Sequence, residues 1–341
     1  MGEAMATARD FRARARGWRA AVTAIVVAAG VVLSGCGDDS AVEPERLAMA
    51  YEGYIGSIVW LPGGQLYVLR MADSASPSEL ALITGSGEGQ TVTVSSTAFC
   101  GTPDILTISG LPHGRLGAVI DCDATTTHVD SRIAAVLDDG KIVKLATLGA
   151  EWVMSWDENL TDGWVEYVAD DCRSIARYKS GLISPFPKHK PAQVVPFDLD
   201  QDFFGPSGCS TPGRAGHLVA GRSSEVFFLV SNEAGAAAVF DDRARWHVVA
   251  FNPKSGLIRQ IGPDFTDHYD LAVSPDETSL LVSGRLDNRR GVWQIDAASG
   301  EVSLALRGRF RAIGVSADSR RAAVARWTPK GDDVVQLDLV R

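Results

Sequence analysis

The sequence lacks the motifs that identify several common enzyme classes. It has no HExxH pair for a zinc peptidase, no G-x-S-x-G nucleophile turn and no G-x-x-x-x-G-K-[ST] phosphate loop. Its five cysteines form no CxxC pair, which leaves zinc-ribbon and redox functions without support. After residue 35 no amphipathic helix of useful length is present. We therefore expect a chain of strands and turns with no recognisable catalytic motif.

The first 35 residues have the pattern of a secretory signal. Residues 1–19 carry five arginines, and the sixteen residues 20–35 are uncharged and rich in valine. This apolar stretch is short for a bilayer-spanning helix, which needs about 20 apolar residues. It ends in Leu33-Ser34-Gly35-Cys36, which resembles the lipobox of bacterial lipoproteins.

A lipobox implies that Cys36 receives a lipid with a palmitate chain and that the chain is cut in front of it. We expect a signal peptide over residues 1–35, a flexible tether over 36–46 and the folded domain over 47–341. The competing interpretation is an uncleaved membrane anchor with an incidental cysteine. The resemblance implies an exported protein of the cell envelope or periplasm. Gly37 lacks the aspartate that retains some lipoproteins in the inner membrane, so the choice of membrane stays open.

Charge argues against nucleic acid as a partner. The whole chain carries −9, and removing residues 1–35, which hold five arginines and two acidic residues, leaves −12. A strongly acidic domain has no electrostatic attraction to phosphate backbones or anionic lipid heads. We therefore expect the lipid to be the only contact with the membrane.

Four cysteines remain after the anchor, and an even number in an oxidising compartment predicts disulfides. Three pairings are possible. We favour the pairing of sequence neighbours, because each bridge then closes a short local loop. The predicted bridges are Cys100–Cys122 and Cys172–Cys209.

A repeat near the end of the chain gives the strongest indication of the fold. Shifting the sequence by 42 residues aligns two segments in one register without a gap. A period of about 40–45 residues with four short strands per unit is typical of a β-propeller blade. The identical pairs are Val273/Val315, Ser274/Ser316, Asp276/Asp318, Val282/Val324, Val292/Val334, Gln294/Gln336 and Asp296/Asp338.

The turns of this repeat resemble those of the WD-like repeats in bacterial envelope propellers. That family has an SPDG turn and a D-x-x-x-G turn in each blade. Here Ser274-Pro275-Asp276-Glu277 supplies the first, with Glu277 in place of glycine, and the segment from Asp296 to Gly300 supplies the second. The propeller of the Tol system's periplasmic component is of this kind. It also has an additional α/β domain, for which this sequence has no room, so Tol partnerships are not carried over.

We predict an all-β, six-bladed β-propeller, with seven blades as the alternative. The last blade is one strand short, and Leu47–Tyr51 is available to complete it and so to join both ends of the domain. A pair of β-sandwiches split near residues 188–212 is the competing fold, but it would not explain the period. The predicted sets of four strands before the repeat span residues 57–95, 105–147, 152–186 and 217–261.

Few residues suggest a metal or cofactor site. Residues 188–213 have no strand character, and Asp198, Asp200 and Asp202 alternate there as in calcium loops. Phe203 stands where an EF-hand needs glycine and Cys209 where it needs glutamate, so we prefer a solvated acidic loop. The histidines show no metal spacing. We expect the tryptophans of strand-like segments to pack between blades; they are Trp60, Trp152, Trp156, Trp164, Trp246, Trp293 and Trp327.

Two functions are compatible with this sequence. The first is a lipid-anchored binding or scaffold protein of the cell envelope, which offers the loop faces of its propeller to a protein or ligand. The alternative is a propeller enzyme, similar to lactonases or quinoproteins, with an axial metal or cofactor. We favour the first, without catalytic residues or a cofactor, because no set of ligands can be placed on the axis from the sequence.

Overall fold

The folded part of the chain is built from β-strands. The structure is a computed structural model that describes residues 44–72, 76–85, 87–98, 100–122, 132–148, 153–156, 162–169, 172–179, 182–185, 193–195, 214–220, 225–231, 245–252, 255 and 257–340. These residues belong to one compact unit, Glu43–Arg341. Within them the only helical segment is the 3-10 turn Pro112–Gly114.

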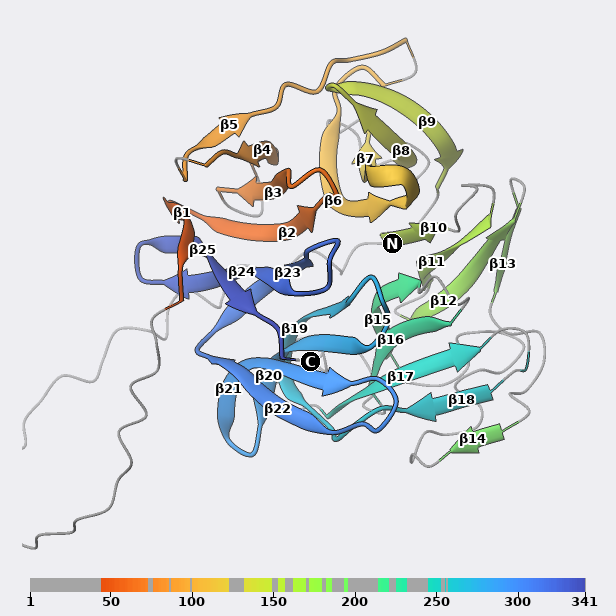
Figure 1. Cartoon of the computed structure of the whole chain (residues 1–341). Coiled ribbons are helices and arrows are strands. Elements are labelled where there is room, and N and C mark those ends of the chain that lie inside the picture. The colour runs from red at the N-terminus through yellow and green to blue at the C-terminus, as the bar shows by residue number, and fades with distance from the viewer. Residues whose placement is uncertain are drawn as a thin grey trace, which may run out of the picture. The chain divides into compact units, whose positions relative to one another are not determined.

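Apart from β1 and β14, the strands form antiparallel sheets in the order of the chain (Figure 1). The first sheet holds β2 (Tyr54–Trp60), β3 (Leu66–Met71), β4 (Glu79–Ile83) and β5 (Gly89–Thr91). The second holds β6 (Asp104–Leu111), β7 (Arg115–Asp121), β8 (Arg132–Asp138) and β9 (Lys141–Thr147). The third holds β10 (Val153–Trp156), β11 (Asp162–Ala169), β12 (Cys172–Lys179) and β13 (Leu182–Pro185).

The later sheets include the repeat. The fourth holds β15 (Arg214–Ala220), β16 (Val226–Ser231), β17 (Trp246–Asn252) and β18 (Leu257–Gln260), joined by β14 (Gln193–Val195). The fifth holds β19 (Thr266–Val273), β20 (Ser279–Leu286), β21 (Arg289–Asp296) and β22 (Val302–Arg307). The sixth holds β23 (Phe310–Val315), β24 (Arg321–Thr328), β25 (Gly331–Asp338) and β1 (Arg46–Tyr51).

This architecture corrects the predicted number of six blades. Five sheets are regular four-stranded blades, whereas the sheet of β15–β18 has a fifth strand, β14, which pairs in parallel with β18. The segment that contains β14 was predicted to have no strand character. Strand β18 would otherwise be an edge with unpaired backbone groups, and β14 covers it. A seventh blade is absent from the residues that the structure describes.

The sheets are arranged as in a β-propeller, which confirms the all-β prediction. The first strand of each sheet contacts the first strand of the next, from β2 through β6, β10, β15 and β19 to β23. Strand β23 in turn contacts β2, so the succession of sheets returns to its start.

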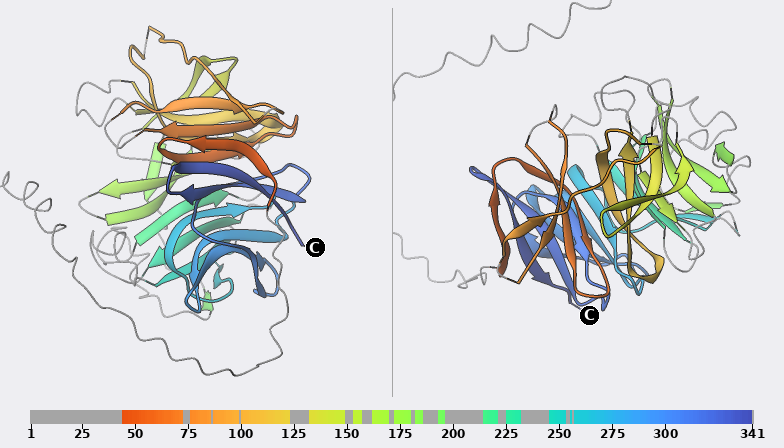
Figure 2. Two further views of the ribbon diagram at one scale, coloured as in Figure 1. Left: turned by 90° about the vertical axis from the view of Figure 1, so that its left-hand side faces the viewer. Right: turned by 90° about the horizontal axis from the view of Figure 1, so that it is seen from above.

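The predicted closure of the ring is present. Strand β1 pairs antiparallel with β25, with Ala48 opposite Val334 and Tyr51 opposite Asp332. Figure 2 shows the red-orange β1 beside the blue strands of the same sheet. Residues almost 300 positions apart in the sequence therefore lie in one blade.

Alternation along each strand explains how the sheets stack. In β24, Ala323 and Ala325 pack in a cluster with Ile58 and Val68 of the first sheet, whereas Ala322 and Val324 pack with residues of the fifth. Successive side chains of a strand point to opposite faces, and both faces are covered here. The middle strands are therefore apolar at consecutive positions. In β24, for example, the apolar residues 322–325 are all buried.

The two turns of the repeat have nearly the same hydrogen bonds. Ser274 Oγ donates to Asp276 Oδ1 at 2.7 Å, and Ser316 Oγ donates to Asp318 Oδ1 at 2.6 Å. Each serine hydroxyl also accepts a backbone N–H at 3.0 Å from the first residue of the following strand. The match in sequence is thus a match in local chemistry.

Candidate functional site

The two ends of the strands in the repeat carry charge of opposite sign. One end comprises the β20–β21 and β24–β25 turns, the β22–β23 link and the adjoining strand residues. It has eight cationic residues, Arg285, Arg289, Arg290, Arg307, Arg309, Arg311, Arg326 and Lys330, against the five acids Asp267, Asp270, Asp287, Asp332 and Asp333. The other end has the six acids Asp276, Glu277, Asp296, Glu301, Asp318 and Asp338, against Arg320 and Arg321.

We call the cationic end, together with Trp327, the arginine face. Trp327 is 42% exposed, and the guanidinium of Arg309 lies 5.6 Å from the centre of its ring. Arg289 lies 5.5 Å from the ring of the buried Trp293. Arg307 completes a group of three exposed arginines that have no ion pair among the described residues. An exposed tryptophan among arginines has the composition of a binding hot spot.

A second group on this face is partly neutralised by Asp267. The carboxylate of Asp267 forms ion pairs with Arg290 and, at 3.6 Å, with Arg285. Asp267 has φ +50°, at an irregularity of pairing between Thr266 and Asp270 in β19. A bulge of this kind re-aims side chains, and here it brings the carboxylate to the two guanidinium groups.

Asp332 joins the last sheet to the first. Its Oδ2 accepts the backbone N–H of Ile55 at 2.9 Å and lies 3.4 Å from Arg311 Nε. Arg311 also stacks on Tyr54, 5.5 Å from the ring centre. Burial raises the pKa of Asp332 above its ordinary 3.8, against the opposing effects of the Ile55 N–H and Arg311. Its Oδ1 is buried without a hydrogen-bond partner among the described residues.

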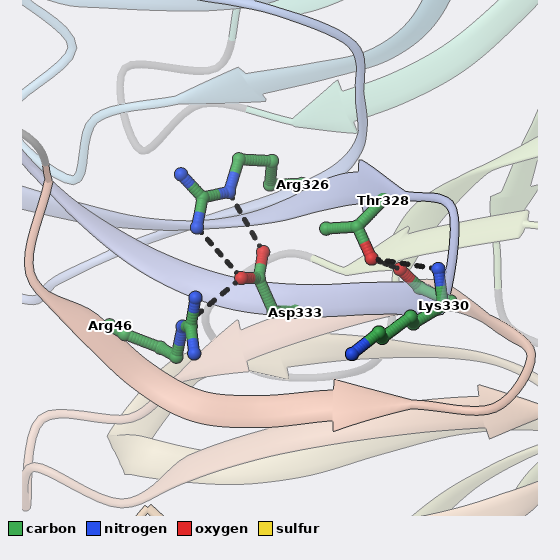
Figure 3. Close-up of polar contacts among 6 residues, drawn as sticks. Arg46, Arg326, Thr328, Lys330 and Asp333 are labelled. Atoms are coloured by element: carbon green, nitrogen blue, oxygen red, sulfur yellow. Dashed lines mark hydrogen bonds and ion pairs between the residues drawn. The ribbon is translucent and has the colours of Figure 1, made fainter.

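The neighbouring Asp333 holds β1 in place. Figure 3 shows its carboxylate between Arg326 of β24 and Arg46 of β1. Arg326 donates two hydrogen bonds, at 3.0 and 2.8 Å, and Arg46 Nε lies 3.2 Å from Oδ2. The carboxylate is almost completely buried, so these bonds replace its hydration.

The opposite end of the repeat carries a shallow, open hollow of about 530 Å³ lined by Asp318, Arg320, Arg321, Asp338 and Leu339. The Ser316 hydroxyl, followed by the Arg320 N–H, lowers the pKa of Asp318. This carboxylate therefore already accepts hydrogen bonds within its own turn.

The structure tests only part of the predicted site. Cys100 and Cys122 form a disulfide. The lipidation residue Cys36, the calcium candidates Asp198, Asp200 and Asp202, and Cys209 of the second predicted bridge lie outside the described residues. The backbone of Cys172 begins β12, and its bridge is not described. Among the residues that are described, no three possible metal ligands come together, and no helix is long and apolar enough to cross a membrane.

The predicted packing of the tryptophans holds in part. Trp246 and Trp293 pack in one buried cluster between the fourth and fifth sheets, and Trp60 is partly buried against the cluster shared by the sixth and first sheets. The expectation was wrong for Trp327, which lies near the end of β24 and is exposed. The side chains of Trp152, Trp156 and Trp164 lie outside the described residues. Among the histidines, His247 Nδ1 lies 2.7 Å from Asp264 Oδ1, which is a pair rather than a metal site.

The sequence analysis missed the arginine face. The chain is acidic overall, and this average conceals the local excess of arginine. Sorting charges by strand end in the aligned repeat would have revealed the polarity. Trp327 carries a weaker signal, since Arg326 before it and Lys330 soon after mark the end of a strand rather than its middle.

Comparisons with known proteins agree with the fold. No family model matches the chain, and no curated protein matches it. The structure is similar to an oligogalacturonate lyase from Vibrio parahaemolyticus, with TM-score 0.54, 7% identity and coverage of 89% of this chain and 95% of that one. TolB from Acinetobacter baumannii has TM-score 0.49 and 10% identity over 84% of this chain, which spans 64% of that protein. A TolB-type protein from Agrobacterium tumefaciens has TM-score 0.49 and 12% identity over 84% of this chain and 91% of that one. At 7% identity the similarity to the lyase concerns architecture alone. The arrangement of the sheets in this chain is that of a β-propeller.

Proposed function

We propose that the chain is a lipid-anchored propeller of the cell envelope that binds a partner on its arginine face. The observation that carries this proposal is the exposed Trp327 beneath Arg309, among arginines without carboxylate partners in the described part of the chain. Large exposed aromatic and arginine side chains are enriched where proteins bind partners. In this proposal the six sheets act as one rigid ring of blades that holds the face in shape.

The anchor and the binding face require separate tests. Cys36→Ser removes the thiol that would receive the lipid, so the variant is expected to leave the membrane fraction and to incorporate no labelled palmitate. Cys172→Ser serves as the control for loss of a cysteine and should remain at the membrane. A membrane-bound Cys36→Ser variant would contradict the anchor but not the binding face.

Binding is tested by cross-linking the whole chain in intact cells. A photoreactive residue in place of Trp327 should capture a defined partner, and the same probe at Glu301, at the other end of the repeat, should not. Capture of the same partner from both positions would contradict the assignment of the arginine face.

The alternative, an enzyme with an axial metal or cofactor, has a direct test. A ligand that binds only the folded state raises its melting temperature. A rise in the melting temperature on calcium titration, abolished by Asp200→Asn, would favour a metal site in the segment that holds Asp198, Asp200 and Asp202.

A further inference from the structure

We infer that the partner on the arginine face is an extended acidic polypeptide segment, an inference that rests on the proposed function. Arg289, Arg307 and Arg309 are exposed and have no ion pair among the described residues. A partner that removed three guanidinium groups from water without supplying anions would lose more free energy by their desolvation than it gained from the contact. A partner must therefore bring negative charge, and carboxylates meet arginine in the two-pronged geometry that forms its strongest hydrogen bonds.

The spacing of the arginines suits an extended chain. Arg307 stands opposite Gly291 in the β21–β22 ladder, which makes Arg289, two residues away, its diagonal neighbour. Diagonal neighbours in a sheet lie about 7–8 Å apart. Alternate side chains of an extended polypeptide lie about 6.8 Å apart on one side. Acidic residues at alternate positions can therefore reach Arg289 and Arg307 in turn, while the side chain between them points to solvent.

Stacking prepares two of these arginines for carboxylates. The guanidinium of Arg309 covers one side of the Trp327 ring, and that of Arg289 covers the ring of Trp293. A stacked guanidinium keeps its edge free to donate, and its orientation is already restricted. The ring of Trp293 is buried, and Arg309 leaves a sugar at most the other side of the Trp327 ring, so the observations favour a polypeptide over an anionic polysaccharide.

The test uses the full folded domain and labelled peptides. A peptide of six Glu-Ser repeats is expected to bind, whereas six Lys-Ser repeats should not. A peptide with the same composition but its six glutamates in one block should bind at least about threefold more weakly, because its charges do not match the spacing. Equal binding of the alternating and block peptides would overturn the inference, since it would indicate a nonspecific attraction of anions.

Matched variants locate the site. Arg307→Glu with Arg309→Glu should weaken binding of the alternating peptide about tenfold, and Trp327→Ala about threefold. Arg320→Glu with Arg321→Glu makes the same change of net charge at the other end and should leave binding within about twofold. Unchanged melting temperatures would establish that both pairs fold. Equal loss in both pairs, or tighter binding of oligogalacturonate or of anionic vesicles than of the peptide, would overturn the inference.

The outcome is separable from that of the proposed function. Cross-linking at Trp327 without binding of any acidic peptide would overturn the acidic partner and leave the binding face standing. Loss of cross-linking at Trp327 with retained peptide binding would instead contradict the proposed function.

Discussion

At the scale of single residues, the two turns of the repeat each place a non-glycine side chain on a left-handed backbone. Glu277 and Ser319 occupy the same position of the two turns and have φ of +58° and +57°. This left-handed region favours glycine, because a Cβ atom crowds the backbone there. The departure of Glu277 from the glycine of the WD-like pattern is therefore a change of residue without a change of turn.

The first prediction follows from that angle. Glu277→Gly is expected to raise the free energy of unfolding by about 0.5–1 kcal/mol, because glycine adopts this φ without crowding. Urea unfolding measures the change. Glu301→Gly, at an exposed position outside the left-handed region, should lower the stability instead. A lower free energy of unfolding for Glu277→Gly would show that the glutamate side chain stabilises the fold by more than the left-handed backbone destabilises it.

The second prediction concerns Asp276 and pH. Partial burial opposes ionisation of Asp276, but hydrogen bonds from Ser274, Thr278 and Ser319 outweigh it, and its pKa lies below the ordinary 3.8. The folded state thus takes up this proton at lower pH than the unfolded chain. The stability from this group is complete above the unfolded value and is lost as the pH falls through the folded one.

Asp276→Asn removes this dependence. We expect the free energy of unfolding of this variant to be about 0.5–1 kcal/mol lower than that of the native chain at pH 7, because its hydrogen bonds are weaker. At pH 3 the difference between the variant and the native chain should be smaller. Urea midpoints at the two pH values measure this. Asp287→Asn, at an exposed turn residue that has no side-chain hydrogen bond or ion pair among the described residues, is the control. An equal deficit at both pH values would refute the assignment.

At the scale of elements, carboxylates complete the irregular pairing of the innermost strands. The pairing of β23 shifts between Phe310 and Ile313, and Asp270 of the preceding sheet accepts the N–H of Ile313 at 2.7 Å. Asp332 does the same for Ile55 at the start of β2. Bulges leave backbone groups outside the ladder, and a buried N–H needs an acceptor. The bulge and the carboxylate of the preceding sheet thus form one unit.

The third prediction concerns the disulfide of the second sheet. Cys100 precedes β6 and Cys122 follows β7, and the bridge closes a loop of 22 residues. A loop of this size corresponds to about 3 kcal/mol in the chain-entropy model. The double variant Cys100→Ala and Cys122→Ala should therefore have a free energy of unfolding about 3 kcal/mol lower than that of the native chain, as measured by chemical unfolding. Reduction of the native chain should produce a similar loss, and insensitivity to both changes would exclude a role of the bridge in stability.

The sequence predicts regular elements better than irregular ones. The second sheet was expected at residues 105–147 and lies at 104–147, because Asp139 and Gly140 form its last hairpin with φ of +47° and +74°. Strand β14 was missed, since three residues among prolines carry no periodic pattern. The bulges were missed because they depend on a neighbouring sheet. Exposure of Trp327 depends on where a blade ends, which strand periodicity does not specify.

At the scale of the whole molecule, one short strand closes the ring. Strand β1 fills the edge of β25, and Arg46 shares the buried Asp333 with Arg326. Ala48 is the only alanine of β1 that is buried, in a cluster with Ile58 and Val334, whereas Ala50 is exposed.

The fourth prediction tests the closure with these two alanines. Ala48→Asp places a charge in the cluster and should lower stability by about 2–4 kcal/mol and promote association through the exposed edge of β25. Ala50→Asp should stay within about 0.5 kcal/mol of the native chain. Thermal unfolding and light scattering measure both effects. Equal behaviour of the two variants would show that β1 does not close the ring in solution.

The pairing of β1 with β25 also constrains when the protein can become native. Residues 46–51 emerge early during synthesis, and their partner residues 331–338 emerge last among the strands. Contacts so distant in sequence slow folding, and the first blades must wait with an open edge. The sixth sheet of a nascent chain therefore stays incomplete until residues 331–338 have been delivered, and any chaperone that protects its open edge must act until then.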